Sequence, residues 1–282
     1  MLRHTFVHLP GIGLKTESSL WQNGIHSWEF FHDEHGWMLT PFGPGKYAAL
    51  RSRLEVCRER LCALDPAYFA GALAQQHLWR LFADFRQCAA FIDIETTGLG
   101  GPYDHITTAA LYDGREVFYY IYGDNLDAFA LDLRKYKILI TYNGSCFDLP
   151  FIRNYFRVAV DHIHIDLRYL LRSLGYGGGL KGCEKSLGLD RAELNGVDGY
   201  FAVLLWREYS KRGSIKALET LLAYNMADTV NLETLMVQAF NMKVSETPFH
   251  ELRIPLPCQP PIPFKPDAAL IDELRQGYFG AF

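Results

Sequence analysis

Residues 90–99 read Ala90-Phe91-Ile92-Asp93-Ile94-Glu95-Thr96-Thr97-Gly98-Leu99. The apolar start of this stretch predicts a buried strand over Cys88–Ile94, and the strand runs straight into two acids one residue apart. Residues i and i+2 of a strand share a face, so Asp93 and Glu95 project together. Two neighbouring carboxylates are costly to bury, and a divalent cation with oxygen ligands is their usual partner. The stretch therefore predicts part of a metal site.

The chain after this stretch predicts an α/β domain with a mixed sheet. Ile106–Leu111 and Val117–Tyr122 are short apolar runs on either side of a turn, so the first strand continues into an antiparallel meander. Further strands are expected at 137–142 and 163–165. Helices are expected over 126–136, 149–158, 167–174, 182–187, 200–211 and 214–241. Strands that alternate with helices favour a sheet with helices on its faces.

Two further acids lie where such a sheet could bring them to the first pair. Asp148 follows the strand at 137–142 and a polar turn, and it opens a helix. Tyr224 and Asp228 are four residues apart on the helix over 214–241, so they share one face of it. An aspartate on an otherwise apolar helix face is poorly explained by packing alone. Taken singly, each motif also fits a surface pair, a helix cap or chance.

Together the three motifs resemble the exonuclease motifs of the DEDD superfamily on a ribonuclease-H-like fold. The tyrosine four residues before the last aspartate places the chain nearest the tyrosine branch, because the histidine branch has its histidine at the position of Ala223. Segments 163–167, 180–184, 187–191 and 11–25 are similar to the bacterial YprB-type ribonuclease-H-like exonuclease family. The resemblance implies a mixed five-stranded sheet flanked by helices, with an N-terminal, mainly helical accessory region.

The resemblance also implies roles for the matched residues. The expected ligands of two divalent cations, Mg²⁺ or Mn²⁺, are Asp93, Glu95, Asp148 and Asp228. Two such cations activate a water and stabilise the leaving 3′ oxygen in an in-line attack on phosphorus. Tyr224 would orient that water. The free pKa of tyrosine, about 10, favours positioning over action as a full base.

Contacts to the nucleotide chain are implied as well. The expected residues are Thr96, Thr97, Gly98, Leu99, Asn143, Phe147 and Lys181. The first three would hold the 3′ end, the leucine would wedge against a base, and the asparagine would bond the next sugar or phosphate. The phenylalanine would stack on a base, and the lysine would meet a phosphate. The last four also have structural explanations: core packing, a turn, packing under the helix, and solvation. His162, His164 and Asp166 invite a metal, but structural roles are favoured, with the aspartate as a helix cap.

Composition limits the partners that the protein could have. The 282 residues are 49% hydrophobic, and the net charge is −4. Contact with nucleic acid must therefore be local, or act through metal at an acidic site. The six cysteines form no CxxC pair, which favours reduced thiols over disulfides or zinc. We find neither a signal peptide nor an apolar run of about 18 residues, and a cytoplasmic protein is expected.

Three regions are predicted along the chain. Residues 1–85 form an accessory region with a hairpin-like segment and helices at 46–64 and 66–85, residues 86–242 form the nuclease domain, and residues 243–282 form an extended, proline-rich tail. The hairpin-like segment, Leu9–Glu17, resembles part of a helix-hairpin-helix element that binds DNA. A simple turn that opens a short helix over Thr16–Trp21 is the favoured alternative, because about eight residues precede the segment.

The predicted function is a metal-dependent 3′–5′ exonuclease that acts on single-stranded nucleic acid. The Gly11-Ile12-Gly13 segment favours DNA over RNA. Two alternatives stay open: a nucleic-acid-binding module with a decayed active site, and a structure-specific endonuclease on the same fold. All four acids and Tyr224 are present, which disfavours decay.

Overall fold

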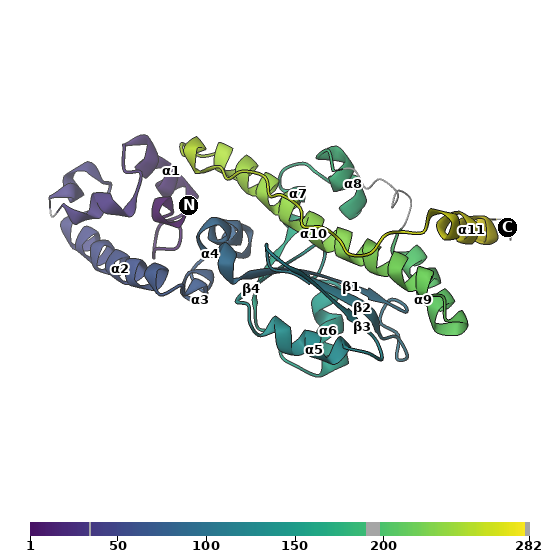
Figure 1. Cartoon of the computed structure of the whole chain (residues 1–282). Helices are drawn as coiled ribbons and strands as arrows, with labels where there is room; N and C mark the ends of the chain where they lie inside the picture. The colour runs from purple at the N-terminus through teal and green to yellow at the C-terminus, as the bar shows by residue number, and fades with distance from the viewer. Residues whose placement is uncertain (34, 190–197, 280–282) are drawn as a thin grey trace. The chain divides into compact units, whose positions relative to one another are not determined.

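A computed structural model describes residues 1–33, 35–189 and 198–279 (Figure 1). The chain divides into two compact units. The first consists of Met1–Arg86 and Phe240–Ile254, and the second consists of Gln87–Ala239 and Pro255–Phe282. All of the predicted site residues belong to the second unit.

A five-stranded mixed sheet forms the centre of the second unit. Its spatial order is β3-β2-β1-β4-β5. The strands are β1 (Ala89–Thr96), β2 (Ile106–Tyr112), β3 (Val117–Ile121), β4 (Ile138–Thr141) and β5 (Ile163–Asp166). The first three pair antiparallel, while β4 pairs parallel with both β1 and β5. The predicted α/β class, with a mixed five-stranded sheet flanked by helices, is confirmed.

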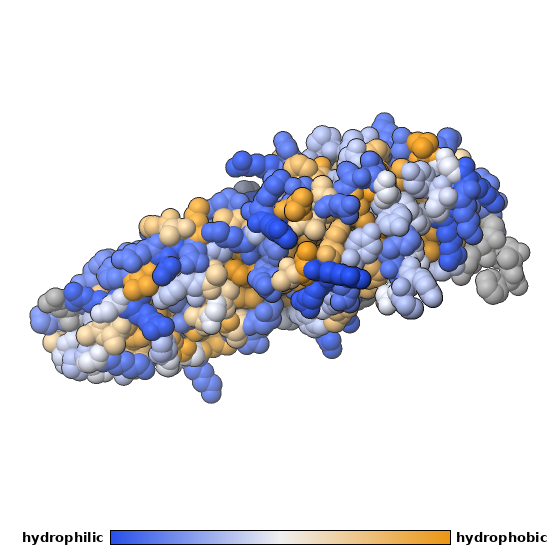
Figure 2. Space-filling view, turned by 90° about the horizontal axis from the view of Figure 1, so that it is seen from below, coloured by the Kyte–Doolittle hydropathy of each residue, from blue (hydrophilic) through white to orange (hydrophobic). Residues whose placement is uncertain are grey.

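Helices cover both faces of this sheet. Two of them, α5 (Leu126–Leu133) and α6 (Asp148–Phe156), lie below it in Figure 1, and the long α10 (Ile215–Ser245) crosses the opposite face. Further helices among the described residues of this unit are α7 (Leu167–Arg172), α8 (Gly179–Ser186), α9 (Gly199–Arg212) and α11 (Ala268–Phe279). On the face that Figure 2 shows, hydrophilic and hydrophobic residues are interspersed.

The alternation of β1 decides which of its side chains meet which helices. Its even-numbered residues Ala90, Ile92 and Ile94 join a buried cluster with apolar residues of α5 and α6. The odd-numbered residues lie on the other face, where Asn225 of α10 donates to Asp93. The strand pattern thus hides three apolar side chains on one side and presents two acids to α10 on the other.

The first unit contains α1 (Leu14–Gln22), α2 (Pro44–Cys62), α3 (Pro66–Ala70) and α4 (Phe82–Phe85). The predicted helix over 66–85 is wrong, because α3 ends at the C-cap Gly71 and a 3₁₀ helix occupies Gln75–Leu81. Four consecutive side chains in that helix, 78–81, are buried. An α-helix with one apolar stripe cannot bury four neighbours in a row.

The hairpin-like segment is a turn that leads into α1. Before it lies only the three-residue 3₁₀ helix Leu2–His4, and Gly13 is the N-cap of α1. The buried Glu17 of α1 accepts hydrogen bonds from the N–H groups of Phe6 and Val7. It also pairs with Arg80 at 2.8 Å. The segment therefore ties the N-terminus into the first unit, and the helix-hairpin-helix element is absent from its described residues.

The C-terminal tail has neither helix nor strand over 253–267 and then forms α11, a helix that the proline-rich composition did not predict. Ile271 of α11 is buried in a cluster with residues of α9 and α10. Asp267 starts the helix, since its carboxylate accepts the N–H of Leu270 and pairs with Lys216 of α10 at 2.8 Å. No helix among the described residues is long and apolar enough to cross a membrane.

Candidate metal centre

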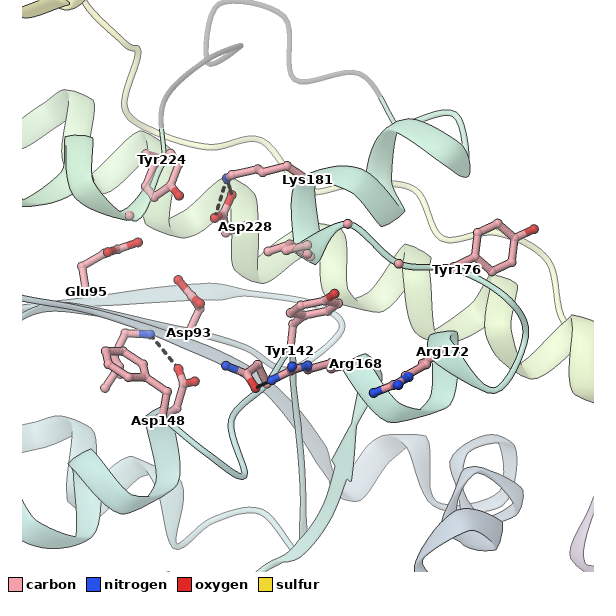
Figure 3. A pocket seen from close by; sticks show the side chains of 18 residues that line it. Asp93, Glu95, Tyr142, Asp148, Arg168, Arg172, Tyr176, Lys181, Tyr224 and Asp228 are labelled. Atoms are coloured by element: carbon pink, nitrogen blue, oxygen red, sulfur yellow. Dashed lines mark hydrogen bonds and ion pairs between the residues drawn. The ribbon is translucent and has the colours of Figure 1, made fainter. Parts of the chain in front are cut away.

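Three of the predicted metal ligands converge at the end of β1. Asp93 and Glu95 leave β1 on the face that meets α10, and Asp228 projects from α10 toward them (Figure 3). One carboxylate oxygen from each of the three lies within 4.8 Å of the other two. Carboxylate oxygens are the ligands that Mg²⁺ and Mn²⁺ prefer, and cysteine and histidine are absent from this trio. The donor set therefore fits a hard divalent cation.

The fourth predicted ligand, Asp148, lines the same cavity but turns one oxygen toward β1. It is the first residue of α6, and its Oδ1 accepts the backbone N–H of Ile94 at 3.2 Å. Burial raises the pKa of Asp148 to about 7. A cation nearby would favour the ionised form, because opposite charge offsets the cost of desolvation.

Asn225 holds Asp93 in place. Its side-chain amide donates to Asp93 Oδ2 at 2.7 Å and to the Asp93 carbonyl at 3.2 Å. Asn225 is fully buried on α10, next to Tyr224 in the sequence. Sequence reasoning missed this residue. The signal in the sequence was an amide side chain inside an apolar run of the helix. A buried amide needs a hydrogen-bond partner.

Lys181 of α8 reaches into the acidic cluster. Its ammonium lies 2.9 Å from Asp228 Oδ2 and 3.1 Å from Oδ1. The same ammonium lies 4.2 Å from the centre of the Tyr224 ring. The predicted pair Tyr224 and Asp228 therefore does share one helix face, and Lys181 spans both members. The lysine is thus ion-paired, while its side chain keeps 35% of its exposure.

The turn after β4 is fixed by Asp166 at the end of β5. Its carboxylate accepts the N–H groups of Asn143 and Ser145, and it caps α7 through the N–H of Arg168. Asn143 has a left-handed backbone with φ of 65°, a conformation that the turn imposes. The interpretation of Asp166 as a helix cap is confirmed.

The two histidines near this strand make structural contacts. Nε2 of His164 bonds to Thr141 at 2.8 Å, and Nε2 of His162 bonds to the carbonyl of Leu133 at 3.0 Å. Phe147 packs against Phe151 of α6 and also lines the cavity. These contacts favour the structural explanations for all three residues.

The loop after β1 presents its leucine to solvent. Leu99 is 94% exposed, so core packing, the alternative explanation for this residue, is wrong. Asp104 closes the loop by accepting the N–H groups of Gly100 and Gly101, and these bonds hold the pKa of Asp104 low. Thr96 is buried, and its hydroxyl donates to the Gly98 carbonyl at 2.6 Å.

The acids open into a cavity of about 540 Å³. Its wall includes the four acids, Tyr224, Asn143, Phe147 and Lys181 from the predicted set, but not Thr96 to Leu99. It also includes Gly177–Gly179 and four residues that sequence reasoning did not single out: Tyr142, Arg168, Arg172 and Tyr176. Ligand-binding cavities in proteins usually have volumes in this range.

The part of the chain that carries the acids resembles a known family. No curated protein matches the chain. Among solved structures, it is similar to the family B DNA polymerase from the hyperthermophilic archaeon Pyrobaculum calidifontis, with a TM-score of 0.44 and 16% identity over 58% of this chain. That match spans 26% of the polymerase chain. A model of the RNase_H superfamily matches residues 90–240, more than half of the 282 residues, from the strand of Asp93 to the helix of Asp228. The chain belongs to the RNase_H superfamily.

Proposed function

We propose that the protein is a metal-dependent 3′–5′ exonuclease that hydrolyses phosphodiester bonds of single-stranded nucleic acid. One observation carries this proposal: Asp93, Glu95 and Asp228 come within 4.8 Å of one another in a cavity that also holds Asp148 and Tyr224. Membership of the RNase_H superfamily supports a nuclease of this kind. A protein that only binds nucleic acid would not need three converging acids that are buried or half-buried.

Each residue of the site has a part in the proposed chemistry. Asp93, Glu95, Asp148 and Asp228 would hold the cations, Mg²⁺ or Mn²⁺. When bound, such cations supply Lewis acidity that activates water and neutralises charge on the phosphate. Tyr224 is only 3% exposed, and its ring lies along the cavity wall. We assign its hydroxyl to orienting the attacking water.

The end of β1 and the loop after it support action at a chain end. Thr96 is the buried last residue of β1, and Thr97, Gly98 and the exposed Leu99 follow it. We assign this loop to the terminal nucleotide. The turn at Gly11–Gly13 gives no support to a preference for DNA, because it begins α1 without a preceding α-helix. Discrimination between DNA and RNA depends on contacts to the 2′-hydroxyl.

The test compares 5′-labelled single-stranded DNA, duplex DNA and RNA of one sequence, with Mg²⁺, Mn²⁺ or EDTA. We expect a ladder that shortens from the 3′ end of single strands and that disappears in EDTA. Asp93→Asn and Asp228→Asn should abolish the ladder, while the exposed Asp127→Asn on α5 should leave it unchanged. Internal cuts would support an endonuclease instead. Tight binding with no hydrolysis under any condition would support a binding module.

A further inference from the structure

The cavity has a basic side that the metal chemistry does not use. Its wall includes Arg168 and Arg172 of α7, together with the rings of Tyr142 and Tyr176. In Figure 3 these four residues lie on one side of the cavity, and Asp93, Glu95 and Tyr224 lie on the other. The cavity is therefore acidic at one end and basic and aromatic at the other.

We propose that Arg168 and Arg172 bind the backbone phosphates that lie 5′ to the scissile bond. This inference rests on the proposed function and specifies its substrate class: an oligonucleotide long enough to reach from the carboxylates to the arginines. The arginine fork matches the oxygens of a phosphate, and guanidinium groups are the preferred partners for this anion. A dinucleotide, with its single internucleotide phosphate, cannot engage the metal centre and the arginines together.

Arg168 is held in a defined position. Its backbone N–H donates to the Asp166 carboxylate at 3.0 Å. One nitrogen of its guanidinium donates to Asn143 Oδ1. A guanidinium has five N–H donors, so this bond leaves further donors for a ligand. The predicted substrate contact Asn143 thus lines the cavity and orients one of its arginines.

Arg172 is better placed to bind an anion than to stabilise the fold. It is exposed at the end of α7, and among residues 1–33, 35–189 and 198–276 no carboxylate forms an ion pair with it. Asp228, an acid of the same cavity that could pair with a cationic side chain, is paired with Lys181. A glycine run, Gly177–Gly179, follows Arg172 along the cavity wall and brings backbone without side chains to it. Bare backbone permits the close approach of a ligand.

The two arginines matter for binding because the chain as a whole carries a net negative charge. With a net charge of −4, the protein does not attract a polyanion by its overall field. Four carboxylates at the cavity add to the repulsion until cations bind. Two arginines in the same cavity supply the positive charge where the strand must lie, and the neighbouring tyrosine rings offer surfaces on which bases stack.

The test measures binding of a 5′-fluorescein-labelled, 12-nucleotide single strand to the full chain by anisotropy, in Ca²⁺ and over a range of salt. Arg172→Gln should weaken binding about five- to tenfold and lower the slope of log K against log[salt] by about 0.7, the value for one phosphate contact on a single strand. Arg172→Lys should keep the slope. Arg153→Gln, which removes an exposed arginine of α6 outside the cavity, should change neither quantity.

A second measurement uses substrate length with Mg²⁺. For wild type, kcat/KM should rise steeply from a dinucleotide to a tetranucleotide, and Arg172→Gln should flatten this rise. Equal salt slopes for wild type and Arg172→Gln would overturn the inference, as would equal kcat/KM for both lengths. A protein that never hydrolyses the strand, yet shows the altered slope in Arg172→Gln, would overturn the exonuclease and keep the phosphate subsite.

Discussion

Lys181 Nζ lies 2.9 Å from Asp228 Oδ2 and 3.1 Å from Oδ1, so one ammonium contacts both oxygens of this carboxylate. The lysine side chain is 35% exposed, whereas Asp228 is 5% exposed. A divalent cation that binds Asp228 must share this carboxylate with the ammonium or displace it. The ion pair therefore offsets one negative charge of the acidic cluster while metal is absent, and it competes with metal for Asp228.

Replacing the lysine should tighten metal binding. In Lys181→Gln we expect the Kd for Mn²⁺ to fall about fivefold, because a half-exposed ion pair is worth about 1 kcal/mol. Isothermal titration of the metal-free protein measures this directly and needs no enzymatic activity. Lys185→Gln, an exposed lysine four residues further along α8, should bind Mn²⁺ like wild type. An unchanged Kd in Lys181→Gln would show that the ion pair does not oppose metal.

Asn225 should act as a positioning residue for Asp93. Asn225→Ala removes the amide that donates to the Asp93 carboxylate at 2.7 Å, and Asp93 can then rotate away from Glu95 and Asp228. Removing such an orienting partner typically costs 10–100-fold in metal affinity or activity. We expect a Kd for Mn²⁺ raised by about that factor, with little change in affinity for the oligonucleotide itself.

The matched control for Asn225 is Asn231→Ala, on the same helix. Asn231 is also buried, but its partners are Glu184 and Gln259 instead of a metal ligand. Both variants should lose comparable thermal stability, since each removes the hydrogen bonds of a buried amide. Only Asn225→Ala should lose metal affinity. Equal metal affinities in the two variants would reduce Asn225 to a structural residue.

Leu99→Ala separates substrate contact from folding. Because Leu99 is 94% exposed, its loss removes almost no packing, and Tm should stay within about 1 °C of wild type. If the terminal base rests on the leucine, KM for a single strand should rise about three- to tenfold. Leu131→Ala, an exposed leucine of α5 that is 61% exposed, provides the control with unchanged KM. An unchanged KM in Leu99→Ala would remove the loop from the binding site.

Local patterns were sufficient to predict the sheet and the acids on it. The alternation in β1 requires that Asp93 and Glu95 share a face, and helical spacing requires the same of Tyr224 and Asp228. These statements depend only on backbone periodicity, so they hold before the chain is folded. The mixed topology followed similarly from the turn between β2 and β3 and from the helices that separate the later strands.

What the sequence left open depends on contacts between distant segments. The pairing of Lys181 with Asp228 joins residues 47 positions apart, and Asn225 reaches Asp93 across 132 positions. No local pattern encodes such contacts. Arg172 is one charge on a short helix, and only the folded chain brings it to the wall of the cavity that holds the acids. Helix α11 was obscured by the prolines before it, which end at residue 266.

Acid should destabilise the first unit through His8. Burial, aided by Arg80 and Arg53, lowers the pKa of His8 to about 3, while the unfolded value is about 6.5. Below pH 6.5 the unfolded chain therefore binds one more proton than the folded chain, and stability falls as pH falls. Between pH 6.5 and 5 this histidine alone should cost about 2 kcal/mol. Urea unfolding of His8→Asn should show a correspondingly flatter pH dependence, whereas the exposed His35→Asn should follow wild type. If the unfolding free energy of His8→Asn depends on pH as steeply as that of wild type, His8 does not stay neutral in the fold.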